Sequence, residues 1–242
     1  ILAVNDGLTV AIRGLGFVNG GGSGSAIEDR AGAVWNDGDL TLQSCYFEGN
    51  SSHLEGGAVY NSGTLRIKQC EFKGNHTRLQ GAAILNNDGL LTIERTLFLS
   101  NVSDASAGAI GNRDALIISN SVFAKNKADG VRGQGGAIYS HSDSVNVSIV
   151  NSTFYENQAA WDKDEFSFNT SNAGSYSLSN VLVANSSANT DCGGSALLAS
   201  NNTNWIQDGS CSASFSGDPQ LQGPENGDYR LSYSSLAIDK GT

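Results

Sequence analysis

The sequence predicts an all-β protein, a parallel β-helix with coils of about 25 residues and a loop-rich cap at its C-terminal end. Three observations predict this fold. A Gly-Ala-aliphatic motif recurs along the chain, a Phe-x-x-Asn motif recurs in phase with it, and the segments between them alternate apolar and polar residues. One such unit cannot bury its own apolar face, whereas stacked copies form a continuous core.

Both motifs keep a nearly constant period. The aliphatic residue of the first motif recurs at steps of 25, 25, 26 and 28 residues, at Val34, Val59, Ile84, Ile110 and Ile138. The second motif occurs at Phe47/Asn50, Phe72/Asn75, Phe98/Asn101, Phe123/Asn126 and Phe154/Asn157, with a degenerate copy at Leu182/Asn185 and an earlier Phe17. We therefore expect equivalent residues to lie one above another along the rod axis.

Each unit contains short strands rather than helices. Apolar residues are spaced by two at 40–42, 65–67, 116–118 and 147–149, which is the strand period. Asn-Asp-Gly turn signals at 36–38 and 87–89 separate these strands. With coils stacked at about 4.8 Å, seven or so coils give a rod roughly 35 Å long.

The repeated residues have structural roles. A small alanine lies where chain segments crowd, and the residue before it is usually a glycine, which suits a bend. The aliphatic and phenylalanine columns are expected to point inward. The position after the aliphatic residue varies, so we expect it on an outward face: Trp35, Tyr60, Leu85, Gly111 and Tyr139.

Two asparagine columns are expected to form internal ladders, in which stacked amides hydrogen-bond along the axis. One column follows the Gly-Ala-aliphatic strand: Asn36, Asn61, Asn86 and Asn112. The other follows the phenylalanine: Asn50, Asn75, Asn101, Asn126 and Asn157.

The repeat is lengthened in the connections 126–135 and 140–147, and it breaks over 158–174. Insertions in solenoids project from one face and often bind partners, so the last segment is the candidate binding loop. A decorated turn without a binding role is the alternative. The loop holds a cluster of aromatic and acidic residues: Trp161, Asp162, Asp164 and Glu165.

We expect the repeats to occupy residues 1–187, with residues 188–242 as a cap, or a continuation, packed on the last coil. A disulfide between Cys192 and Cys211 would close about 20 residues, contribute roughly 3 kcal/mol and suit an oxidising compartment. Cys45 and Cys70 each precede a repeat phenylalanine by two residues. They are expected to stack as buried thiols, because parallel side chains are poorly aimed for a disulfide.

The net charge of −10 disfavours a nucleic-acid or anionic-membrane partner, because both require clustered Lys and Arg. No apolar run approaches the roughly 18 residues of a membrane-spanning helix, so direct membrane insertion of this segment is not expected. The missing initiator Met and the lack of a secretory leader indicate a fragment or a processed chain.

No constellation of catalytic residues is in register. Arg66 and Lys68 match the Arg-x-Lys of a polygalacturonase-like site, but they alternate along a strand as exposed polar residues would. The acidic residues of the 158–174 loop could supply the two carboxylates that a glycosidase needs. However, no acidic residue at an equivalent position of a neighbouring repeat would pair with them. The histidine spacing does not indicate zinc, and neither a metal nor a cofactor is expected.

The paired motifs over residues 17–185 resemble the repeats of polymorphic outer membrane proteins, which occur in chlamydial autotransporter adhesins. Ala82 in place of glycine and Ala107 before Gly108 depart from the motif. The tail, including Asp191-Cys192-x-Gly194, resembles the end of choice-of-anchor type secreted β-helix proteins. The resemblance implies a right-handed parallel β-helix, secretion and cell-surface attachment, with no catalytic residues to carry over.

The sequence thus favours a non-catalytic structural or adhesive module at the cell surface or secreted, as part of a longer rod or filament. The expected partners are a cell-surface or matrix component, a glycan or another copy of the chain. The alternative is a carbohydrate-active enzyme or a glycan-binding relative acting on extracellular polysaccharide. Outside the ladders, the accessible candidates for N-glycosylation are Asn146, Asn169 and Asn201.

Overall fold

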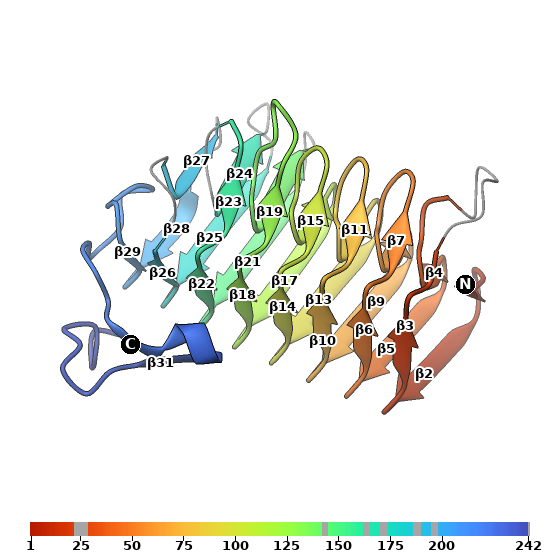
Figure 1. Cartoon of the computed structure of the whole chain (residues 1–242), viewed down its shortest axis with the longest axis horizontal. Helices are drawn as coiled ribbons and strands as arrows, with labels where there is room; N and C mark the ends of the chain where they lie inside the picture. Colours follow the sequence, from red (N-terminus) through yellow and green to blue (C-terminus); the bar gives the residue numbers. More distant parts are fainter. Residues whose placement is uncertain are drawn as a thin grey trace.

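The computed structural model describes residues 1–21, 29–141, 145–161, 165–169, 174–185, 190–194 and 198–241. In these residues, parallel sheets run side by side along one rod (Figure 1). The one helix in the described ranges is a single 3-10 turn. No helix of this part of the chain is long and apolar enough to cross a membrane. The predicted all-β parallel solenoid is confirmed.

Sheet A contains the Gly-Ala-aliphatic motif, and all its neighbouring strands are parallel and in register, with Val59 between Val34 and Ile84. Its strands, in spatial order, are β1 (Leu2–Val4), β4 (Val34–Asn36), β8 (Val59–Asn61), β12 (Ile84–Asn86), β16 (Ile110–Asn112), β20 (Ile138–His141), β24 (Phe166–Asn169) and β27 (Cys192–Gly194).

Sheet B contains the longest strands, in which buried and more exposed residues alternate as the sequence predicts. They are β2 (Thr9–Arg13), β5 (Asp39–Gln43), β9 (Thr64–Lys68), β13 (Leu90–Glu94), β17 (Ala115–Ser119), β21 (Asn146–Val150), β25 (Ser175–Ser179) and β28 (Leu198–Asn202).

Sheet C carries the repeat phenylalanines. Its strands are β3 (Gly16–Val18), β6 (Tyr46–Glu48), β10 (Glu71–Lys73), β14 (Leu97–Leu99), β18 (Val122–Ala124), β22 (Thr153–Tyr155), β26 (Leu182–Ala184) and β29 (Trp205–Ile206). The phenylalanine rings from Phe17 to Phe154 stack in one column with centroids 4.5 to 5.0 Å apart. Equivalent residues therefore do lie one above another.

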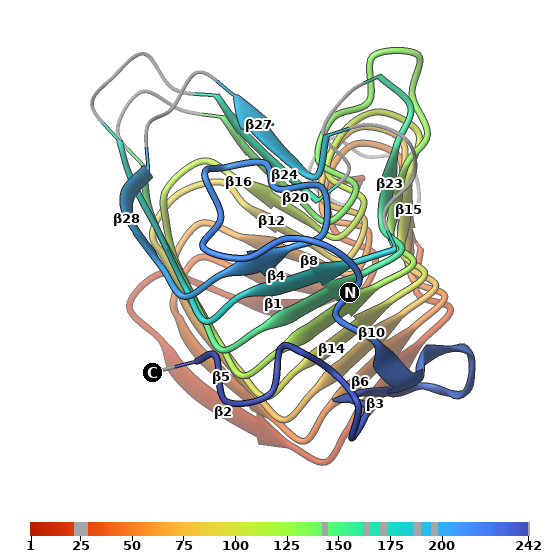
Figure 2. The same cartoon turned by 90° about the vertical axis from the view of Figure 1, so that its left-hand side faces the viewer.

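Sheet D consists of two-residue strands on a projecting part of five successive coils. They are β7 (Ser51–Ser52), β11 (His76–Thr77), β15 (Val102–Ser103), β19 (Lys127–Ala128) and β23 (Gln158–Ala159). We call each of these strands, with the segment that returns to sheet A, an arm. In the view along the rod (Figure 2), the arms project together beside sheet A.

The arms fold over the outer face of sheet A, which the sequence did not indicate. The residues after the aliphatic position were expected on an outward face, and they do point away from the main core. However, Tyr60 and Leu85 are buried with Ala31 in a second apolar cluster, against which Trp35 packs. A Cβ added at Gly111 would lie 3.4 Å from the Cβ of Gln80, an arm residue.

The three long sheets continue past residue 187 by one further coil, formed by β27, β28 and β29. In this coil Cys192 pairs with Phe166 in sheet A, and Ile206 pairs with Val183 in sheet C. This coil lacks both repeat motifs, and Cys192 and Ile206 take the positions of the aliphatic and phenylalanine residues. The tail then forms a hairpin of β30 (Leu221–Gly223) and β31 (Asp228–Leu231), joined by η1 (Pro224–Asn226).

Candidate functional site

The asparagine column after the phenylalanines forms a continuous buried ladder. From Asn50 to Asn157, each Nδ2 donates to the Oδ1 of the next coil at 2.8 to 3.0 Å. From Asn75 on, each Oδ1 also accepts the backbone N–H of the preceding asparagine, and the Oδ1 of Asn50 accepts that of Gly20. Each Nδ2 also donates to the carbonyl of an earlier phenylalanine. These amides are fully used by the fold and are not available to a ligand.

The second column forms a ladder of the same kind. Its Nδ2 to Oδ1 distances are 2.7 to 2.8 Å from Asn36 to Asn112, and Asn112 donates to Ser140 Oγ at 3.2 Å. The first acceptor, Asn36 Oδ1, is buried without a hydrogen-bond partner among the described atoms. Val4 occupies the equivalent position in the preceding coil, so no amide is present there to donate.

Glu165 belongs to the ladder rather than to a surface loop. Its side chain is completely buried, and Asn157 Nδ2 donates to its Oε2 at 2.6 Å. The degenerate Asn185 is exposed and donates to the hydroxyl of Tyr155 instead. The carboxylate of Glu165 therefore takes the place of the amide oxygen that the next coil does not supply. Glu165 does not share a surface with Trp161.

Cys45 and Cys70 are free buried thiols in one column, as predicted. Each heteroatom of the column accepts the backbone N–H of the coil before it: Cys70 Sγ from Cys45 at 3.3 Å and Thr96 Oγ1 from Cys70 at 3.4 Å. Burial raises the pKa of the Cys70 thiol to about 11, which disfavours the reactive thiolate. The predicted disulfide between Cys192 and Cys211 is present in the last coil.

Two sequence insertions meet on the arms. The lengthened connection 126–135 forms a turn from Gly130 to Gly133, and the backbone N–H of Trp161 donates to the carbonyl of Gly133 at 3.1 Å. The guanidinium of Arg132 lies over the Trp161 ring, 5.7 Å from its centroid. We call the turn and Trp161 together the arm tip. The loop after β19 extends farther than the arms that follow β7, β11 and β15 (Figure 1).

The arm tip is strongly exposed. Val131 is 89% exposed and Trp161 is 54% exposed. Asp162 and Asp164, the other members of the predicted cluster, lie outside the described residues. Sequence analysis found both insertions but missed Val131 and Arg132, because nothing in one sequence shows that the two connections share one place on the rod.

A polar clamp fixes the arms against the rod. The guanidinium of Arg113 forms an ion pair with Glu55, donates to Asn87 Oδ1 at 2.8 Å and donates to Gln80 Oε1 at 3.3 Å. Glu55 and Gln80 belong to two successive arms, whereas Asn87 and Arg113 lie in the turns between sheets A and B. The clamp therefore ties these two arms to the body of the rod.

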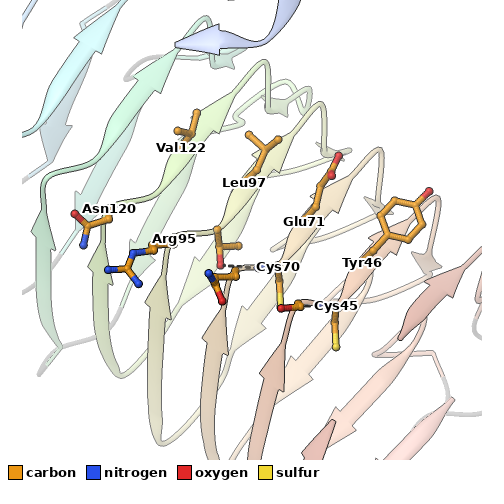
Figure 3. Close-up of a pocket in the computed structure, with 11 residues that line it drawn as sticks. Cys45, Tyr46, Cys70, Glu71, Arg95, Leu97, Asn120 and Val122 are labelled. Carbon is orange, nitrogen blue, oxygen red and sulfur yellow. Dashed lines mark hydrogen bonds between the residues drawn. The ribbon is translucent and has the colours of Figure 1, made fainter. Parts of the chain in front are cut away.

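A shallow groove of about 460 Å³ runs along the corner between sheets B and C (Figure 3). Tyr46, Glu71, Leu97 and Val122 form one side, and Arg95 and Asn120 lie on the other. Its floor includes the buried cysteines and Thr96, whose polar atoms already bond the backbone. The groove is thus wide and mixed in character.

The remaining predicted residues lie on the surface without a shared site. Arg66 pairs with Asp39, and Lys68 pairs with Glu94 at 3.3 Å, so both are members of exposed ion pairs. Within the described ranges, no group of three or more His, Cys, Asp or Glu side chains has the geometry to hold a metal ion.

The three glycosylation candidates differ in their surroundings. Asn146 is exposed at the start of β21. Asn201 donates from Nδ2 to the carbonyls of Cys211 and Ser212, so the nitrogen that would carry a glycan is used within the fold. Asn169 ends β24, and its side chain lies outside the described part of the structure.

Comparison with known proteins gives one family. The model of the Chlamydia polymorphic membrane protein repeat matches residues 44–62 and 120–141. Both segments run from the corner before sheet C, through an arm, to the next strand of sheet A, and the second contains the arm-tip turn. No curated protein and no solved structure matches the chain. Two segments of the parallel β-solenoid therefore match the repeat of the Chlamydia polymorphic membrane proteins.

Proposed function

We propose that this chain is a surface-displayed, secreted module with a structural and adhesive role, part of a longer rod, and that it binds through the arm tip. The carrying observation is that the two insertions converge on one exposed place, whereas the repeated residues serve the core and the ladders. The family match supports the surface location, because its repeat is that of polymorphic membrane proteins. The partner is a cell-surface or matrix component.

The test is a binding assay of the purified chain on cultured epithelial cells and on immobilised matrix proteins. Trp161→Ser should reduce binding strongly while leaving the circular dichroism spectrum unchanged, because the side chain is half exposed. Tyr233→Ser is the matched control, since Tyr233 is 94% exposed and lies in the tail after β31. Equal binding by wild type and Trp161→Ser would remove the arm tip from the adhesive surface.

The groove favours a second candidate function, glycan binding without catalysis. It runs along the rod axis across successive coils, so an extended oligosaccharide would meet repeated side chains such as Gln69, Arg95 and Asn120. An array of neutral and uronate oligosaccharides, probed with wild type and Arg95→Ala, tests this candidate. Release of new reducing ends from any of them would instead indicate a carbohydrate-active enzyme.

A further inference from the structure

We propose that the turn from Gly130 to Gly133 is a preformed recognition element that docks into a protein pocket with an apolar wall and a carboxylate. This inference rests on the proposed adhesive function and names the chemistry of the partner. It is carried by the construction of the turn, by the side chains that it displays and by the charge of the whole chain.

The turn is held at both ends. Gly133 N–H donates to the carbonyl of Gly130 at 2.6 Å, which closes it. A Cβ added at Gly130 would lie 2.6 Å from the carbonyl oxygen of Asp104, and one added at Gly133 would lie 2.5 Å from that of Ala128. The two glycines therefore lie in direct contact with neighbouring backbone, and a side chain at either position would clash with it. A turn held in this way loses little conformational freedom on binding.

The side chains at the apex face solvent. Val131, at 89% exposure, contributes nothing to either apolar cluster. Arg132 stacks on Trp161 within the distance of a cation–π contact. Arg132 is exposed, and within the described ranges no ion pair involves its guanidinium, so its N–H donors are open to a partner.

These side chains define the partner. A guanidinium pairs best with a carboxylate, which it binds through two parallel hydrogen bonds. A branched aliphatic side chain gains free energy only where an apolar wall removes it from water. Trp and Arg are also the residues that dominate protein–protein interfaces. Polyanions are disfavoured by the net charge of −10, and a sugar ring would stack on a flat aromatic face rather than on valine.

The first test does not need the natural partner. A phage library of random disulfide-cyclised peptides is selected on immobilised wild type after depletion on the double variant Val131→Ser/Arg132→Ala. We expect enriched peptides to combine Asp or Glu with a bulky apolar residue and to bind Arg132→Ala about tenfold or more weakly. Recovery only of peptides without an acidic residue, or of peptides that bind both proteins equally, would overturn the inference, and so would recovery of none.

A matched control is available on an ordinary arm. Arg78 and Leu79 are an adjacent, exposed Arg–aliphatic pair, so Arg78→Ala/Leu79→Ser should bind the selected peptides like wild type. In the cell assay, the full chain carrying Val131→Ser/Arg132→Ala should bind less than wild type, and the chain carrying Arg78→Ala/Leu79→Ser should bind like wild type. Lack of cell binding by wild type would contradict the proposed function alone, whereas cell binding that Val131→Ser/Arg132→Ala does not reduce would contradict the inference.

A membrane surface is the competing occupant. Val131→Ser/Arg132→Ala should not change sedimentation with vesicles of phosphatidylcholine and phosphatidylserine, because wild type should not bind them. Vesicle binding that the double variant loses would replace the protein pocket with a lipid headgroup and overturn the proposal.

Discussion

Asn101→Ala should destabilise the rod far more than an ordinary surface substitution. The Asn101 side chain accepts the N–H of Asn75 at 3.0 Å and its Nδ2 at 2.9 Å, and it donates to the carbonyl of Phe72 at 3.0 Å. Truncation removes the partner that this side chain gives to three buried polar groups of the preceding coil, of which Asn75 Nδ2 keeps another partner, the carbonyl of Phe47. At about 1–3 kcal/mol for each, with partial relaxation, we expect a loss of about 3–5 kcal/mol.

Urea unfolding followed by circular dichroism measures this loss, and hydrogen exchange locates it. The backbone amide of Asn75 should lose protection first. Asn146→Ala is the control, because Asn146 is exposed on a strand of the same solenoid, and it should change stability by no more than about 0.5 kcal/mol. Equal unfolding midpoints for the two variants would refute the argument that the ladder amides are indispensable.

Three further predictions concern single residues. Gly57→Ala should lower the free energy of unfolding in urea by about 2–3 kcal/mol, because its Cβ would lie 2.1 Å from a backbone oxygen. Gly74→Ala is the comparison: its Cβ would meet no atom within 4 Å, so it should cost only about 1 kcal/mol. Similar costs for the two variants would argue against crowding at Gly57. Burial raises the pKa of the Cys70 thiol from 9.0 to about 11, so the stability that the protonated thiol gives the folded state is complete below about pH 9 and is lost toward pH 11. The urea midpoint of unfolding should therefore fall more between about pH 9 and about pH 11 for wild type than for Cys70→Ser. Equal falls for the two proteins would show that the thiol is not the cause. Reducing the disulfide between Cys192 and Cys211 should lower the stability of the last coil by about 3 kcal/mol. Hydrogen exchange should then become faster in that coil only. An equal increase in exchange along the whole rod would contradict this local role.

The repeated part of the fold could be predicted because identical residues meet along the axis. The spacing of the phenylalanines predicted the stacked rings, and the phase of Asn50 and Asn75 predicted the ladder. The paired position of Cys45 and Cys70 likewise predicted a common column. In each case a stacked fold makes sequence distance a direct measure of spatial neighbourhood.

Features formed between different parts of a coil could not be predicted. The burial of Tyr60 depends on an arm that folds back over sheet A, and the sequence of the arms varies from coil to coil. Glu165 was assigned to a surface loop because an isolated acid usually lies in water; the ladder end that buries it is apparent only in three dimensions. The contact of Arg132 with Trp161 joins two insertions whose lengths alone did not place them together.

The ladder imposes a direction on the rod. Each asparagine side chain completes the hydrogen bonds of the coil that precedes it, and the carboxylate of Glu165 completes those of Asn157. A coil is therefore satisfied only once its C-terminal neighbour exists. Assembly that begins at the Glu165 end would template each new winding on a finished surface, whereas growth from the other end would leave an unsatisfied layer at every step.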